Sequence, residues 1–76
     1  MKVDIHYCVP WNYKPQAASL ADELRKAFGV ESELVPGTNG VFDVIVDGKQ
    51  VFSKAEIGRF PDSGEIVKKL NLWYPY

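Results

Sequence analysis

The chemistry of this chain is expected at its one cysteine, Cys8, which lies between a strand-like pattern and a helical pattern. Apolar and polar residues alternate before Cys8, whereas apolar residues recur at helical spacing after Pro15. Cys8 is therefore predicted to lie near the N-terminus of a helix. The unpaired N–H groups and the dipole at such a place favour a thiolate over a thiol. We expect a nucleophilic sulfur that faces solvent.

The spacing around Cys8 is that of a CxxC redox motif whose second cysteine is replaced. Cys8 is followed by the spacers Val9 and Pro10, by Trp11 at the fourth position, and then by a helix. In a dithiol mechanism the first sulfur attacks a substrate disulfide and the second resolves the mixed disulfide. An indole can do neither. Two-cysteine chemistry is excluded in the form shown, and whether the chain is an enzyme stays open.

Other side chains add little to this chemistry. His6 could share a strand face with Cys8 and support its thiolate as an imidazolium, although a hydrogen-bonded strand histidine is commoner. A zinc site normally needs three or four protein ligands, and the chain has one cysteine and one histidine, so no metal is predicted. Asp62 and Glu65 are explained by a helix capping box rather than by acid–base catalysis.

Aromatic residues are expected near the cysteine. Trp11, Tyr13, Phe60 and Trp73 could form an apolar docking surface around Cys8, because exposed aromatic residues on loops are typical of partner interfaces. They could equally close the small core at its edge. Trp11 is expected to be exposed in either arrangement.

Length and composition limit the classes of protein. Seventy-six residues with 46% hydrophobic content predict one folded domain over residues 1–76. Nine basic and ten acidic residues spread along the chain argue against nucleic acid and membrane surfaces as partners. The sequence begins Met1-Lys2-Val3-Asp4, with an acidic residue where a signal peptide needs its apolar stretch, and one cysteine fits a reducing compartment. A cytoplasmic protein, monomeric or weakly dimeric, is expected.

The patterns predict four strands and two helices. Asp47-Gly48 favours a type I′ hairpin, Pro15 and Gly29 begin and end the first helix, and Asp62 with Glu65 begins the second. The segment 54–60 is expected to be irregular, and the aromatic tail 72–76 not to be helical throughout. The strands are predicted at 2–7, 30–35, 41–46 and 49–53, the loop between the second and third at 36–40, and the helices at 15–28 and 63–70.

This order, β-α-β-β-β-α, predicts an α/β (α+β) fold with a thioredoxin-like layout. The first connection is a right-handed parallel crossover, and the hairpin strands are antiparallel, which gives a mixed four-stranded sheet. We expect one helix on each side of the sheet. The predicted core consists of Leu20, Leu24, Phe28, Val44, Val46, Ile66, Val67 and Leu70.

These residues resemble those of a known family, the selenoprotein W-like (SelT/SelW/SelH, Rdx) group of small thioredoxin-like proteins. The stretch from Tyr7 to Pro15 is similar to the redox loop of the family, in which a cysteine and a second cysteine or selenocysteine flank two residues. The segments 36–54 and 58–61 are similar to its hairpin and to the loop before its last helix. The resemblance covers nearly the whole chain except the aromatic tail.

The resemblance implies thiol- or selenol-dependent redox chemistry, with glutathione or protein thiols as partners and no other cofactor. It implies Cys8 as the attacking thiolate and position 11 as the resolving site. The neighbouring residues expected to bind the partner are Val9, Pro10, Asn12, Tyr13 and Phe60.

Trp11 leaves three explanations open. It falls at the position that the family gives to selenocysteine, whose UGA codon is one base from the UGG of tryptophan, and we hypothesise that it replaces a native selenocysteine. The chain could instead be a natural monothiol protein, in which Cys8 forms a mixed disulfide with glutathione or a sulfenic acid. The third explanation is a thioredoxin-like module that has lost redox chemistry and only binds proteins.

Overall fold

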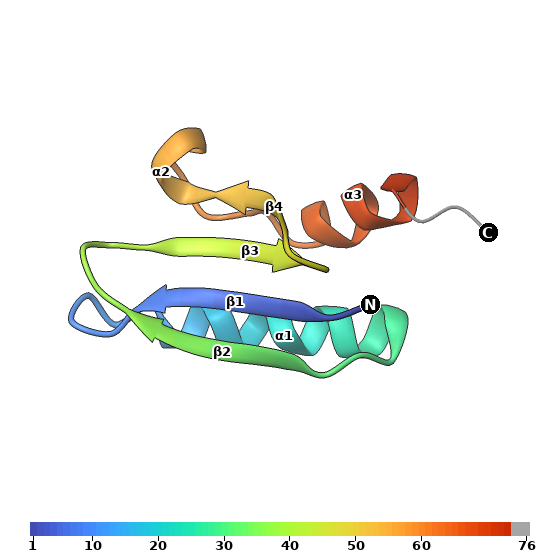
Figure 1. Ribbon diagram of the computed structural model, residues 1–76, viewed down its shortest axis with the longest axis horizontal. Coiled ribbons are helices and arrows are strands. Elements are labelled where there is room, and N and C mark those ends of the chain that lie inside the picture. Colours follow the sequence, from blue (N-terminus) through green and yellow to red (C-terminus); the bar gives the residue numbers. More distant parts are fainter. Residues whose placement is uncertain (74–76) are drawn as a thin grey trace.

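One mixed four-stranded sheet forms the centre of the structure, a computed structural model that describes residues 1–73 (Figure 1). The strands are β1 (Val3–Cys8), β2 (Ser32–Gly37), β3 (Phe42–Val46) and β4 (Lys49–Ser53), in the order β2-β1-β3-β4. β1 is parallel to β2 and antiparallel to β3, and β3 is antiparallel to β4. The predicted β-α-β-β-β-α order and mixed sheet are confirmed. No helix among residues 1–73 is long and apolar enough to cross a bilayer.

The first helix, α1 (Lys14–Phe28), agrees closely with its prediction. Pro15 lies in its first turn, where a missing N–H costs no helical hydrogen bond. Gly29 ends it in the left-handed region at φ 69°, and its N–H donates to the carbonyl of Arg25 at 2.8 Å. Gly29 is therefore a glycine C-cap, in agreement with the predicted helix end.

The segment after β4 is less irregular than predicted. A one-turn helix, α2 (Lys54–Ile57), follows β4 directly and ends at Gly58 with φ 88°. One turn is too short to show helical periodicity, which is why the sequence pattern missed it. The last helix, α3 (Glu65–Trp73), begins and ends later than predicted and includes the first part of the aromatic tail; residues 74–76 lie outside the described part.

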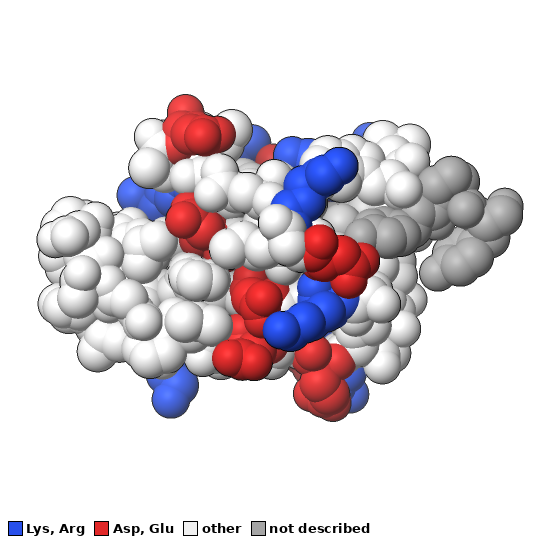
Figure 2. All heavy atoms as spheres, viewed as in Figure 1, with Lys and Arg blue, Asp and Glu red and all other residues white. Residues whose placement is uncertain are grey.

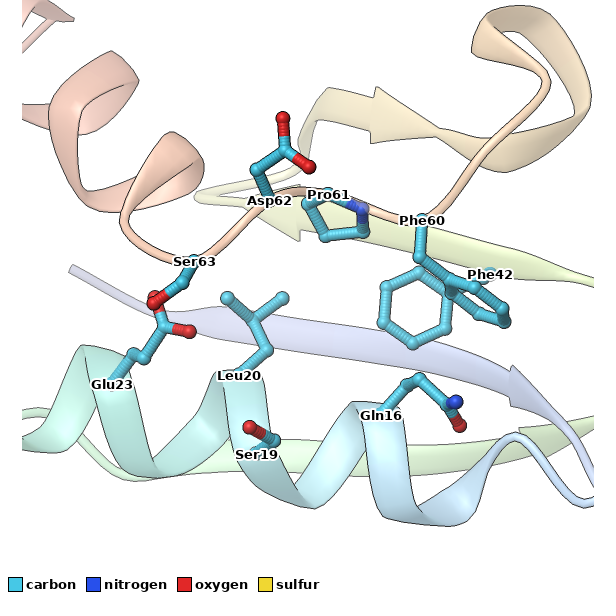
Figure 3. A pocket seen from close by; sticks show the side chains of 9 residues that line it. All are labelled: Gln16, Ser19, Leu20, Glu23, Phe42, Phe60, Pro61, Asp62 and Ser63. Carbon is cyan, nitrogen blue, oxygen red and sulfur yellow. The ribbon is translucent and has the colours of Figure 1, made fainter.

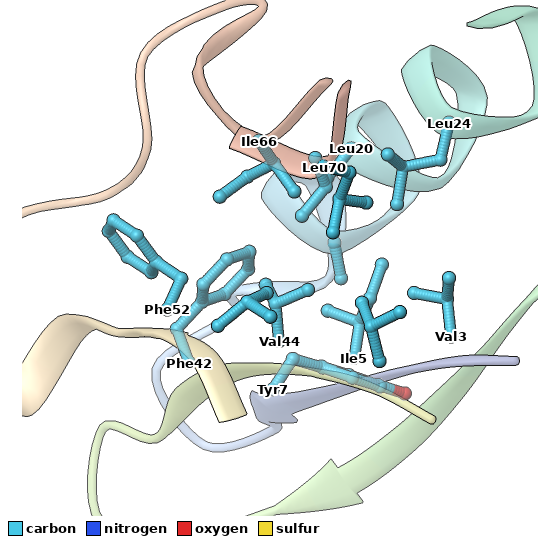
Figure 4. Packing of buried hydrophobic residues seen from close by; sticks show 13 residues of the cluster. Val3, Ile5, Tyr7, Leu20, Leu24, Phe42, Val44, Phe52, Ile66 and Leu70 are labelled. Carbon is cyan, nitrogen blue, oxygen red and sulfur yellow. The ribbon is translucent and has the colours of Figure 1, made fainter. Parts of the chain in front are cut away.

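Both long helices cover the same face of the sheet, so the prediction of one helix on each side is wrong. Val3, Ile5 and Tyr7 of β1 point to this face, and the buried residues of α1 and α3 join them in one cluster (Figure 4). The two helices also touch each other. A direct link is the Glu23 carboxylate of α1, which accepts the N–H of Gly64 at 2.8 Å.

The core agrees with most of the predicted residues. Phe28 and Val67 are only half-buried and pack at the margin of the cluster. β1 supplies three more core residues, and β3 and β4 supply Phe42, Val51 and Phe52. The predicted residues that are buried are Leu20, Leu24, Val44, Val46, Ile66 and Leu70.

The hairpin agrees with its prediction, whereas β2 differs from its predicted bounds. Asp47 and Gly48 both have positive φ, 52° and 81°, as the predicted type I′ hairpin requires. β2 begins later than predicted and continues through Pro36 and Gly37, because this edge strand pairs with β1 as far as Cys8 and a proline is tolerated at a sheet edge.

The start of α3 has one half of the predicted capping box. The Glu65 carboxylate accepts the backbone N–H of Asp62 at 2.9 Å, while the Asp62 carboxylate lies 3.8 Å from Arg59. Arg59 also donates to Glu65 at 2.7 Å. Glu65 thus ties the 59–62 segment to the helix start.

Glu65→Gln is expected to lower the free energy of unfolding by about 1 kcal/mol at pH 7, as the loss of a helix cap does. The hydrogen bond from Arg59, followed by that from the Asp62 N–H, holds the pKa of Glu65 below its usual range. A carboxyl with a lowered folded pKa stabilises the fold above its unfolded pKa of about 4.3, and this stabilisation is lost as pH falls through the folded value.

Urea titrations at pH 7 and again below about pH 4 measure this difference, which should shrink in acid. Glu56→Gln, which changes an exposed glutamate of α2, is the matched control and should leave stability unchanged. An equal loss at both pH values would contradict the assignment.

Candidate functional site

Cys8 is the last residue of β1 and is completely buried, with 0% of its surface exposed. The expectation that its sulfur faces solvent is therefore wrong. Because Tyr7 points towards the helices, Cys8 points to the opposite face of the sheet, and it is not part of the described core cluster. The chain folds back over the strand end: Val9 N–H donates to Gly37, and Tyr13 N–H donates to the Cys8 carbonyl, each at 3.0 Å.

The loop between β1 and α1 forms a hydrogen-bonded turn. Asn12 N–H donates to the Val9 carbonyl at 3.0 Å, with Pro10 at the second position that this kind of turn favours. Asn12 adopts φ 58°, a left-handed conformation that asparagine tolerates. Trp11 is left 61% exposed, so its predicted exposure is confirmed.

The indole of Trp11 rests against Gly40 in the loop between β2 and β3. A Cβ atom added to Gly40 would lie 2.5 Å from Cζ3 of Trp11, well inside van der Waals contact. Gly40 also has φ 73°. The glycine therefore serves a close approach of backbone and ring, in addition to the turn. It brings residue 40 beside the site, which the sequence pattern did not indicate.

A chain of aromatic rings connects Trp11 with the core. The ring centroids of Trp11 and Tyr13 are 6.0 Å apart, those of Tyr13 and Phe60 4.7 Å, and those of Phe60 and Phe42 5.2 Å, all edge to face. Tyr13 and Phe60 are half-buried and Phe42 is buried. Tyr13 and Phe60 therefore close the core at its edge, which is one of the two expected arrangements, while Trp11 stays exposed to solvent.

Trp73 does not belong to this group. It lies beside Lys49 and Lys69, with their amines 5.5 Å from its ring, and shares a hollow with Val46. Val46 pairs with Val3 at the start of β1, which is the end of the sheet away from Cys8. The expectation that Trp73 contributes to the surroundings of Cys8 is wrong.

A pocket of about 200 Å³ lies between α1 and the segment before α3 (Figure 3). Its floor is apolar and its rim carries hydroxyl, amide and carboxyl groups. Of the predicted site residues, only Phe60 lines it. The lining residues are Gln16, Ser19, Leu20, Glu23, Phe42, Phe60, Pro61, Asp62 and Ser63.

Similarity to known proteins extends over nearly the whole chain, since residues 2–72 match the Rdx family. This chain is a member of the Rdx family. It is 34% identical over 74 residues to selenoprotein W of Danio rerio, covering 92% of this chain and 86% of that protein. It is 28% identical over 71 residues to migration and invasion enhancer 1 of Bos taurus, covering 92% of this chain. The chain spans 62% of the length of the bovine relative and 58% of its Mus musculus counterpart.

Solved structures share the fold of this Rdx protein. A protein of Bordetella parapertussis has 30% sequence identity and a TM-score of 0.90, with 96% of each chain covered. A selenoprotein W-related protein of Vibrio cholerae has 27% identity and a TM-score of 0.86, covering 92% of this chain and 91% of that one. The resemblance inferred from the sequence and the thioredoxin-like fold class are confirmed. This Rdx chain is a thioredoxin-like protein of a redox-related family.

Two further side chains of the Rdx chain lie near the loop. Lys54, the first residue of α2, places its amine 5.6 Å from the Tyr13 ring and 5.3 Å from the Phe60 ring. His6 is half-buried, and its cross-strand neighbours are Asp43 and Val35. Among residues 1–73, no three His, Cys, Asp or Glu side chains gather where they could hold a metal ion. The sequence did not indicate that Lys54 lies near the loop, because its position depends on the path of the chain after β4.

Cys8 is buried, so alkylation of its thiol in the folded Rdx chain requires local opening. We therefore expect the folded chain to react with iodoacetamide at least about tenfold slower than the chain unfolded in urea. Mass spectrometry of timed samples measures both rates. Cys8→Ser with Ala18→Cys, which places a thiol on the exposed side of α1, is the control and should react quickly in both states. Equal rates for Cys8 in both states would show that the sulfur is accessible.

Proposed function

We propose that this chain is a thiol-dependent redox protein of the selenoprotein W type, with its site in the loop from Cys8 to Tyr13. Cys8 is 0% exposed whereas position 11 is 61% exposed, and this contrast supports a particular order in which the two positions react. Thiol–disulfide exchange requires access to the attacking sulfur. Position 11 would therefore make the first attack and Cys8 would resolve, the reverse of the roles that the family resemblance implied.

With a thiol or selenol at position 11, the proposed reaction has two steps. The anion at position 11 attacks one sulfur of a partner disulfide, forms a mixed disulfide, and releases the other sulfur as a thiolate. Cys8 then gives up its proton and attacks position 11, which forms the internal bond and releases the second thiolate. Two electrons pass from the pair to the partner. Glutathione disulfide or a protein disulfide is the proposed partner, in a reducing cytoplasmic compartment.

The residues around position 11 fit the docking of such a partner. Val9 is 53% exposed and Pro10 is exposed, while the Tyr13 ring contacts both the Trp11 and the Phe60 rings. Asn12 sets the turn that presents position 11. We propose that these residues hold the partner, and that Trp11 in this chain occupies the place of a native selenocysteine. A UGA at codon 11 of the native gene would support this origin, and an ordinary UGG would remove it.

A variant with a single thiol at position 11 tests which position is reactive. The chain with Cys8→Ser and Trp11→Cys is expected to form a mixed disulfide with glutathione disulfide in its folded state, observed as one added glutathione by mass spectrometry. The unmodified chain, with Cys8 alone, is the matched control and should form the adduct only when unfolded. Adduct formation by the folded control and not by the variant would reverse the assignment, and no adduct on either would contradict the redox proposal.

The structure also favours a second candidate for the chain as it stands, a module that only binds proteins. Its sulfur is buried, while the indole of Trp11, which contacts Gly40, is 61% exposed on the loop. Exposed tryptophans of this kind are common at binding hot spots. If the single-thiol variant fails to react with any disulfide, this candidate is preferred.

A further inference from the structure

Lys54 is a cation held beside the redox loop by two aromatic rings. It follows β4 directly and is half-buried, and its amine lies 5.6 Å from the centroid of Tyr13 and 5.3 Å from that of Phe60. Tyr13 in turn contacts Trp11, with 6.0 Å between centroids. Cation–π contacts of this kind fix the direction of a long flexible side chain. The positive charge is thus held one ring away from position 11.

Lys54 forms no ion pair with any residue in the range 1–73. Phe42 faces the core, so Asp43 points to the other face of the sheet. Glu56 is two residues along α2, a spacing at which helical side chains do not face each other. On the face seen in Figure 2, no acidic side chain is visible at the end of the molecule formed by the loop between β1 and α1 and by the β2–β3 connection.

We propose that Lys54 selects among the thiol partners of position 11, favouring those with a carboxylate close to the reacting sulfur. This inference rests on the proposed redox function and names the class of partner: small or peptide disulfides with net negative charge near the sulfur. The partner's sulfur meets position 11 in front of Tyr13, and its carboxylate lies towards the amine of Lys54. The uncompensated charge attracts an anionic partner and repels a cationic one.

The test measures how fast the Cys8→Ser, Trp11→Cys chain forms mixed disulfides with glutathione disulfide (anionic), hydroxyethyl disulfide (neutral) and cystamine (cationic). The new bond joins the sulfur at position 11 to one sulfur of the reagent, and the other leaves as a thiolate. Adding Lys54→Met removes the charge and keeps the apolar stem over the rings. With glutathione disulfide we expect about a threefold slower reaction, the effect of one charge several ångströms away in a watery environment.

The neutral reagent should react at an unchanged rate, and cystamine should react about threefold faster. Lys54→Glu should enlarge both changes to about tenfold, and about 1 M salt should remove them. Lys49→Met, at the opposite end of the sheet beside Trp73, is the matched control and should change none of the three rates.

The outcomes separate the two proposals. If the single-thiol chain reacts with none of the three reagents, the redox function itself fails. If it reacts but Lys54→Met leaves each of the three rates unchanged, only the selection by charge fails. A similar fall with all three reagents would show that Lys54 acts by holding the rings in place, and this also overturns the proposal.

Discussion

Trp11→Cys is expected to give a dithiol that closes an internal disulfide with Cys8 under mild oxidation. The two positions have the spacing of a CxxC motif, and the loop between them is already folded: Asn12 donates to Val9, and Tyr13 donates to Cys8. The new sulfur would start from a fixed turn, so little chain entropy is lost on closing so short a loop. Formation should be independent of protein concentration.

Thiol titration and intact mass measure this result. The reduced variant should show two reactive thiols after unfolding, and the oxidised monomer should show none and weigh two hydrogens less. Trp11→Ser, which removes the indole without supplying a sulfur, is the matched control and keeps its one thiol. Disulfide-linked dimers without any internal bond would show that residues 8 and 11 are not placed as a redox pair, and would contradict the proposed site.

Leu24→Ala is expected to lower the free energy of unfolding by about 2–5 kcal/mol. Leu24 is 0% exposed and lies where α1 meets the sheet and α3, as Figure 4 shows. Truncation removes the burial of its side chain and leaves a cavity that the surrounding strands and helices cannot fill. A domain of this size has little stability to spare, so a measurable fraction of the variant should be unfolded at 37 °C.

Urea unfolding followed by circular dichroism gives the free energy. Leu72→Ala in α3 is the control, because its side chain is 74% exposed and surface changes usually shift stability by less than about 0.5 kcal/mol. Similar losses in the two variants would mean that the cluster between the sheet and the two helices is not the main source of stability.

Local rules explain why much of the fold could be predicted from the sequence. Gly29 ends α1 in the left-handed region, and Asp47 with Gly48 forms the predicted hairpin, because each depends on a few adjacent residues. The face covered by α3 depends instead on contacts between distant segments, such as the Glu23 carboxylate with the Gly64 N–H. Nothing in the sequence around Glu23 indicates this contact.

In the candidate site, too, some features could be predicted from local sequence and others depend on distant segments. The motif spacing located Cys8 and Trp11, and the exposure of Trp11 was predicted from local sequence. The burial of Cys8 could not be, because it depends on Gly37 and on the chain that folds over the end of β1. The approach of Gly40 to the indole, and of Lys54 to Tyr13, likewise joins segments that are far apart along the chain.

The exposed indole in the loop between β1 and α1 is also an intrinsic fluorescence probe. Trp11 is largely exposed on this loop, and the other tryptophan, Trp73, lies at the opposite end of the sheet. In a Trp73→Phe chain, the tryptophan fluorescence would come from the loop alone. A shift of that emission to shorter wavelength would report a partner arriving at the loop, without any attached dye.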